Sequence, residues 1–130
     1  MNIGDSLVNV TREVTSKDIC QYADASGDFN PIHIDPAFAT STRYGGVIAH
    51  GMLSLAYVWE MMTLTFGDDW INGGKLKIRF RGPVFPGDLV STSGVIKETH
   101  RDGGIMHCGI ECKNQRGEYV ITGDGWIDTK

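Results

Sequence analysis

The chain has 130 residues, of which 41% are hydrophobic and 22% charged, a balance typical of a folded domain rather than of a disordered segment. The formal net charge of −4 excludes the basic surface that nucleic-acid-binding domains present. No stretch approaches the roughly 18 uninterrupted apolar residues of a membrane-spanning helix. We therefore expect one domain over residues 1–130, with neither a nucleic-acid nor a membrane partner.

The compartment can be inferred from the N-terminus and the cysteines. Residues 1–6 carry neither a basic segment nor an apolar core, so they do not form a secretory signal. Three cysteines in a chain of this size fit a reducing compartment better than a disulfide framework. We expect a cytoplasmic protein.

In chain order, residues 7–14 alternate in hydrophobicity and predict a short strand whose members Val8 and Val10 share a face. Thr15 or Ser16 can cap a following helix. Asp35 is a good N-cap, and a proline follows it at the first helical position, so a second helix is predicted over residues 36–41.

The second half changes from helical to strand periodicity. Residues 50–66 are mostly apolar and lack glycine and proline after Gly51, which predicts a long helix buried nearly all round. Residues 75–81 alternate between charged and apolar side chains, as in a half-buried strand. Three further strands are predicted at residues 89–99, 105–114 and 119–128, separated by glycine-containing turns at 102–104 and 115–117. This order predicts an α+β fold with an antiparallel sheet around the helix.

One segment places an acid and a base five positions apart around a turn: Gly27-Asp28-Phe29-Asn30-Pro31-Ile32-His33. Proline restricts the residue before it, so a helix is not expected to run through the segment. A carboxylate and an imidazole that converge there could hold a water between them and exchange its protons. The alternative is a structural turn, because Asp and Asn before a proline commonly bond to nearby backbone N–H groups.

Two later segments extend this pattern. An Asp-Pro pair opens an alanine-containing stretch at residues 34–39, and His50-Gly51-Met52 opens the long helix. Residues 80–88 contain a Phe-x-x-Pro-Val-x-x-Gly-Asp segment. In this order the segments closely resemble the signature of the MaoC-like (R)-specific enoyl-CoA hydratases and 3-hydroxyacyl dehydratases. The resemblance implies a hot-dog fold, a homodimer and an acyl-CoA or acyl-carrier thioester substrate.

The resemblance also implies roles for individual residues. Asp28 is expected to activate the water that adds to C3, and His33 to give a proton to C2, while the backbone N–H of Gly51 binds the developing oxyanion. Asn30 is a supporting candidate through its amide, or a turn former alone. His50 is expected to be structural rather than catalytic. Gly51 could instead serve only to permit close packing.

Substrate-binding candidates are Arg79 and Arg81 for phosphates, and Tyr57 and Trp59 for the acyl chain. The alternatives are a solvated strand face for the arginines and ordinary core packing for the aromatic residues. His107 falls on the opposite strand face from Cys108 and Cys112, and no CxxC pair or glycine-rich phosphate loop exists, so neither metal nor cofactor is expected. Two other functions compete with the hydratase: a hot-dog thioesterase and a non-catalytic acyl-thioester-binding subunit.

Overall fold

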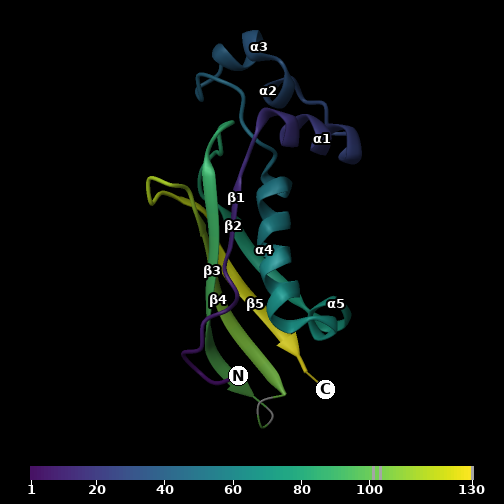
Figure 1. The fold of residues 1–130 in the computed structure, drawn as a ribbon, viewed down its shortest axis with the longest axis vertical. Coiled ribbons are helices and arrows are strands. Elements are labelled where there is room, and N and C mark those ends of the chain that lie inside the picture. The colour runs from purple at the N-terminus through teal and green to yellow at the C-terminus, as the bar shows by residue number, and fades with distance from the viewer. Residues whose placement is uncertain (101, 103, 130) are drawn as a thin grey trace.

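A five-stranded antiparallel sheet lies against one long helix in the computed structural model, which describes residues 1–100, 102 and 104–129 (Figure 1). The strands are β1 (Val10–Glu13), β2 (Lys75–Phe80), β3 (Leu89–His100), β4 (Ile105–Lys113) and β5 (Tyr119–Asp128). They lie in the order β1-β3-β4-β5-β2, and all neighbours are antiparallel. The predicted α+β class is confirmed, and the last four strands agree with the structure to within one residue.

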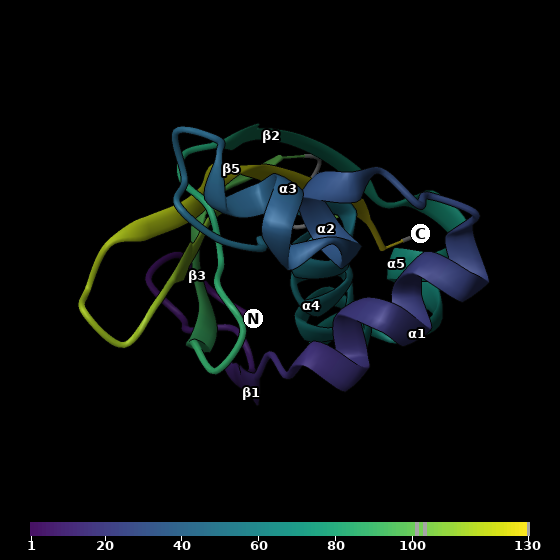
Figure 2. The ribbon, with the colours of Figure 1, turned by 90° about the horizontal axis from the view of Figure 1, so that it is seen from above.

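The helices occupy two places around this sheet. The long helix α4 (Gly51–Phe66) runs along one face, and α5 (Asp68–Gly73) follows its C-terminal end (Figure 1). Three further helices, α1 (Ser16–Ser26), α2 (Pro31–Ile34) and α3 (Pro36–Thr40), gather over the opposite end, where α4 begins (Figure 2). A sheet packed against one central helix is the predicted architecture.

The helix boundaries follow from local capping chemistry. The side chain of Thr15 accepts a hydrogen bond from the backbone N–H of Asp18, and Asp18 bonds back to the N–H of Thr15, which closes a capping box on α1. At α3 the Asp35 carboxylate accepts from two backbone N–H groups, and Pro36 takes the first helical position. These are the caps that the sequence predicted.

The core lies between α4 and the inner face of the sheet. Met61 and Met62 of α4 are fully buried against side chains that alternate along β4, including Cys108 and Cys112. A Cβ atom at Gly125 of β5 would lie 2.9 Å from the Met62 Cε. The missing side chain therefore lets the helix approach the sheet closely.

The strand predicted at residues 7–14 was too long. Only Val10–Glu13 forms β1, and Val8 is exposed although Leu7 and Val10 are buried. The reason is that the backbone N–H of Val8 donates to the Thr65 hydroxyl of α4 at 2.9 Å instead of entering a strand ladder. The predicted pairing of Val8 and Val10 on one face is therefore wrong.

The prediction that the long helix is buried nearly all round is also wrong for a single chain. Val58 is fully buried, but Met52, Trp59 and Leu64 are 56%, 48% and 56% exposed. One sheet covers one side of a helix, so the other side of α4 presents an apolar surface to solvent.

The short helix α5 was not anticipated, although its Trp70 is one of the most deeply buried side chains. The predicted turn at residues 102–104 lies partly outside the described residues. Within the described part of the chain, no helix has the length and apolar character needed to cross a membrane. The cytoplasmic location stays a prediction.

Candidate active site

The turn between α1 and α2 positions the acid and the base. Gly27 ends α1 in the left-handed region at φ 77°, a conformation that favours glycine. The side chain of Asn30 then accepts a hydrogen bond from the Ile32 N–H at 3.1 Å and caps α2, with Pro31 at its first position. As expected, no helix runs through the segment: α1 ends before Gly27, and a separate helix begins at Pro31, since proline is well suited to the first helical position.

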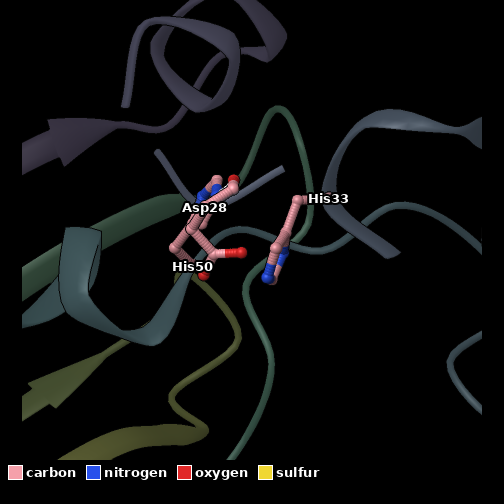
Figure 3. A group of neighbouring side chains, drawn as sticks. All are labelled: Asp28, His33 and His50. Carbon is pink, nitrogen blue, oxygen red and sulfur yellow. Dashed lines mark hydrogen bonds between the residues drawn. The ribbon is translucent and has the colours of Figure 1, made fainter. Parts of the chain in front are cut away.

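Asp28 and His33 face one another across the turn, and Figure 3 shows a carboxylate oxygen of Asp28 directed toward the His33 ring. The Asp28 carboxylate accepts from the Asn30 N–H at 3.2 Å and is otherwise open to solvent. The His33 Nδ1 lies 2.8 Å from the Ile48 carbonyl oxygen. A carbonyl can only accept, so Nδ1 carries the proton, and the second nitrogen, Nε2, is available to the site.

His50 fastens this turn to the start of α4. Its Nε2 donates to the main-chain carbonyl of Asp28 at 3.0 Å, and its ring stacks on His33 with centroids 3.9 Å apart. Tyr22 packs on the same ring at 4.8 Å, and His50 is 2% exposed. Its Nδ1 is buried and has no hydrogen-bond partner among the described residues. The supporting role predicted for His50 therefore has a physical basis in two contacts to the predicted acid–base pair.

The same three side chains also offer possible ligand atoms to a metal ion. One donor atom from each of Asp28, His33 and His50 lies within 4.8 Å of the other two. The two rings, however, stack at an interplanar angle of 26°. The lone pairs of the two rings therefore lie in two nearly parallel planes, one above the other. A metal ion would have to lie in both planes, because a tetrahedral site requires ligands that converge on one point. The geometry favours proton transfer over metal coordination.

The first residues of α4 adjoin this cluster. His50 is the N-cap, and no side chain caps the helix, so the N–H groups of its first turn are left without a side-chain acceptor. Gly51 is exposed, and a Cβ atom there would lie 3.0 Å from the Phe80 ring of β2. Both interpretations of Gly51 are thus supported, because the residue leaves an open backbone and also permits close packing by Phe80.

A cleft of about 320 Å³ opens beside Gly51. It is lined by Gly51 and Ser54 of α4, by Phe80 at the end of β2 and by Arg81 directly after it. The loop before α4 also contributes to the lining, with Arg43, Tyr44, Ile48 and Ala49. The sequence predicted Gly51 and Arg81 as site residues but missed Arg43, because nothing in a local pattern indicates that this loop lies across from β2.

The other substrate-binding candidates lie away from this cleft. Arg79 projects from β2 opposite Thr122 of β5. Tyr57 packs against the core, where burial and the charge of Asp18 raise the pKa of its hydroxyl. Trp59 packs edge-on against Trp70 of α5 at 5.0 Å. Their roles in substrate binding stay predictions.

Asp88, in the segment at residues 80–88, is a structural residue. It is 5% exposed and accepts hydrogen bonds from the Phe85 N–H at 2.9 Å, the Gln115 side chain at 2.8 Å and Arg116 at 3.4 Å. Burial acts to raise the pKa of Asp88, but these bonds outweigh it and hold the pKa below its usual range. Asp88 thus anchors the loop that leads into β3.

The segment around His107 behaves as its alternation predicts. His107 lies on the outer face of the sheet, where its Nε2 is 2.8 Å from Asp124 and its ring stacks on Trp126. Cys108 and Cys112 point into the core as free thiols. Burial raises their pKa values to about 11 and about 12, respectively. These thiols are therefore packing residues and stay protonated near neutral pH.

Known proteins resemble this chain over nearly its whole length. Residues 2–114 match the family model described as MaoC like domain. The (R)-specific enoyl-CoA hydratase of Aeromonas caviae is 29% identical over 122 residues, covering 91% of this chain and 88% of that protein. The 3-hydroxyacyl-thioester dehydratase Z of Mycobacterium tuberculosis is 36% identical over 102 residues, covering 75% of this chain and 68% of that protein.

The chain also matches part of a much larger protein. It is 31% identical over 120 residues to mouse peroxisomal multifunctional enzyme type 2 and spans 15% of that protein's length. Among solved structures, the (R)-hydratase of A. caviae involved in PHA biosynthesis superposes with a TM-score of 0.87 at 25% identity. That superposition covers 100% of this chain and 98% of the other.

Proposed function

The chain belongs to the MaoC-like domain family and has its hot-dog fold, and from this membership and the site geometry we propose that it is a hydro-lyase. The proposed reaction is the reversible addition of water to a trans-2-enoyl thioester, which gives a 3-hydroxyacyl thioester. The observation that carries the proposal is the pairing of Asp28 with a free ring nitrogen of His33 on one small exposed volume.

The proton movements follow from the hydrogen bonds of the two groups. Ionised Asp28 accepts a proton from water while the water oxygen forms a bond to C3. Protonated His33 carries its second proton on Nε2, because Nδ1 is held by the Ile48 carbonyl, and Nε2 is then the atom that gives a proton to C2. After the addition Asp28 is protonated and His33 is neutral. The same pair in these states catalyses the reverse reaction, dehydration.

Charge on the thioester oxygen is the second requirement of this reaction. Addition at C3 drives electron density onto the carbonyl oxygen, which must be met by donors already in place. The backbone N–H of Gly51 is the proposed donor, since it belongs to the uncapped first turn of a 16-residue helix. The missing side chain lets a substrate oxygen approach the amide.

The proposed product has the (R) configuration at C3. A water held by both Asp28 and His33 would lie on one side of an enoyl group fixed beside them and could attack only that face. The name of the A. caviae relative specifies this configuration for that protein. Chiral analysis of the product from crotonyl-CoA tests the proposal, and a predominantly (S) product would contradict it.

The reaction class is tested by two assays on one purified sample. Loss of enoyl absorbance from crotonyl-CoA without release of free thiol is the expected result. Release of thiol at a matching rate would instead identify a thioesterase. No change in either signal, with the substrate still bound, would identify a non-catalytic acyl-thioester-binding protein.

We also propose that the functional unit is a homodimer. The apolar side of α4 exposes Met52, Trp59 and Leu64, and β2 ends the sheet with an unpaired edge. Association of two copies would cover both features. Light scattering on an active sample is the test, and full specific activity at a mass near the 14.3 kDa of one chain would refute the proposal.

A further inference from the structure

The cleft beside Gly51 has a charge opposite to that of the protein. The chain carries 12 basic and 16 acidic residues, yet two arginines, Arg43 and Arg81, line this cleft and no carboxylate does. The remaining lining residues are apolar or uncharged. Two cations without a counter-charge favour an anionic ligand at this place.

Both arginines are exposed, and each guanidinium group makes a side-chain hydrogen bond without being neutralised. The Arg43 Nη2 donates to the Tyr44 hydroxyl at 2.7 Å, and its Cζ lies 4.8 Å from the centre of the Tyr44 ring. The Arg81 Nε donates to the Thr122 hydroxyl at 2.8 Å. Within residues 1–100, 102 and 104–129 neither group forms an ion pair, whereas Arg12 and Arg116 both do. Their remaining N–H groups are free to bind a planar or tetrahedral oxyanion.

The two arginines and the proposed oxyanion donor line the same cleft. Arg43 belongs to the loop before α4, Arg81 follows β2, and Gly51 lies at the uncapped N-terminus of the helix. A ligand in the cleft would therefore place an anionic group at the arginines and another part beside Gly51. A thioester at the end of a phosphate-bearing arm carries both kinds of group.

We propose that Arg43 and Arg81 bind the phosphate of the substrate's 4′-phosphopantetheine arm and so direct the thioester to Gly51. The inference rests on the proposed hydratase function and deepens it. CoA thioesters and acyl-carrier thioesters both contain this phosphate, so the two arginines would bind either kind of substrate in the same way.

The test compares substrates with and without the phosphate. Arg43→Gln and Arg81→Gln are each assayed with crotonyl-CoA, with a crotonyl-carrier-protein thioester, and with crotonyl-N-acetylcysteamine, which lacks phosphate. We expect KM to rise about 10-fold for both phosphate-bearing thioesters with kcat little changed. For crotonyl-N-acetylcysteamine we expect kcat/KM to stay unchanged. Lys75→Gln is the matched charge control, because Lys75 is exposed on β2 outside the cleft.

Each failure has its own signature. An equal loss on crotonyl-N-acetylcysteamine would overturn the phosphate contact, because this substrate has no phosphate to lose. A loss confined to crotonyl-CoA would also overturn it, since the contact would then be with the nucleotide phosphates. Failure of the hydratase function itself would appear as no turnover of any thioester by the wild type. Whether CoA or a carrier protein supplies the phosphopantetheine arm is decided by the wild type, as the substrate with the higher kcat/KM of crotonyl-CoA and the crotonyl-carrier-protein thioester.

Discussion

Two aspartates in two motifs of this chain have opposite surroundings. Asp28, in the turn between α1 and α2, is exposed and accepts one backbone hydrogen bond at 3.2 Å. Asp88, in the loop before β3, is 5% exposed and accepts bonds from Phe85, Gln115 and Arg116. Asp28 retains acceptor capacity toward solvent or substrate, whereas the oxygens of Asp88 are committed to the protein.

The comparison shows that membership of a family motif does not by itself define a role. Both aspartates belong to segments by which the chain resembles its family. A group that must exchange protons has to keep free lone pairs, while a group that stabilises a loop has to fill them. We therefore expect substitutions of Asp28 to change activity and substitutions of Asp88 to change stability.

The largest expected effect is on turnover. Asp28→Asn keeps the size and the turn-forming ability but removes the base, and His33→Ala removes the acid. Each change is expected to lower kcat by about 10²- to 10⁴-fold, the usual contribution of a positioned acid or base. Steady-state hydration of crotonyl-CoA measures this, with thermal unfolding as the control for folding. Near-wild-type turnover by both variants would contradict the proposal that Asp28 and His33 are the catalytic base and acid.

The next effect is on folding. Asp88→Asn replaces one acceptor oxygen by an amide NH2, which faces either the Phe85 N–H or the Gln115 and Arg116 donors. The free energy of unfolding should therefore fall by about 1–3 kcal/mol. Urea denaturation measures the loss. The comparison would break if the variant kept its stability but lost kcat per folded molecule, because Asp88 would then take part in the chemistry.

A smaller effect is expected where the turn meets α4. His50→Phe keeps an aromatic ring against His33 but removes the donor to the Asp28 carbonyl, so kcat should fall about 10-fold through misplacement of the turn. His50→Gln, which can still donate to that carbonyl, should retain more of the activity. A loss that is equal in both variants would assign the effect to ring packing or to the lost imidazole chemistry instead of the hydrogen bond.

The smallest effect concerns pH. The pKa of Asp88 is lowered in the folded state, so its contribution to stability is present above the unfolded pKa of 3.8 and is lost as pH falls through the folded value. The difference in unfolding free energy between wild type and Asp88→Asn should therefore shrink as pH falls below this range. Urea denaturation between neutral and acidic pH measures the difference, and a constant value would contradict the shift.

Local chemistry made much of the fold predictable. The caps at Thr15 and Asp35 and the alternation in β2, β4 and β5 depend on neighbouring residues, and a sequence shows these directly. The helix α5 escaped prediction because six residues are too few for a helical period to appear. Val8 escaped because its partner, Thr65, is 57 positions away.

The candidate site divides in the same way. Asp28 and His33 could be singled out because five positions around one turn keep them close. Arg43 could not, since its place opposite Arg81 depends on how the loop before α4 packs beside β2. Conversely, Arg79 and Arg81 fall on the same predicted face, but only Arg81 lines the cleft. The alternation of residues predicts the face of a strand on which a side chain lies, but not which position along the strand meets a cleft.

The hydrogen bonds that orient the two imidazoles also bear on how readily this site could be diversified. Both end on main-chain carbonyls, those of Ile48 and Asp28. A main-chain acceptor is retained whatever side chain its residue carries, and Ile48 lines the cleft beside Gly51. Position 48 can therefore vary in size and polarity while its carbonyl still fixes the tautomer of His33. At this one residue, the side chain can change the shape of the cleft while the main chain keeps the orientation of His33.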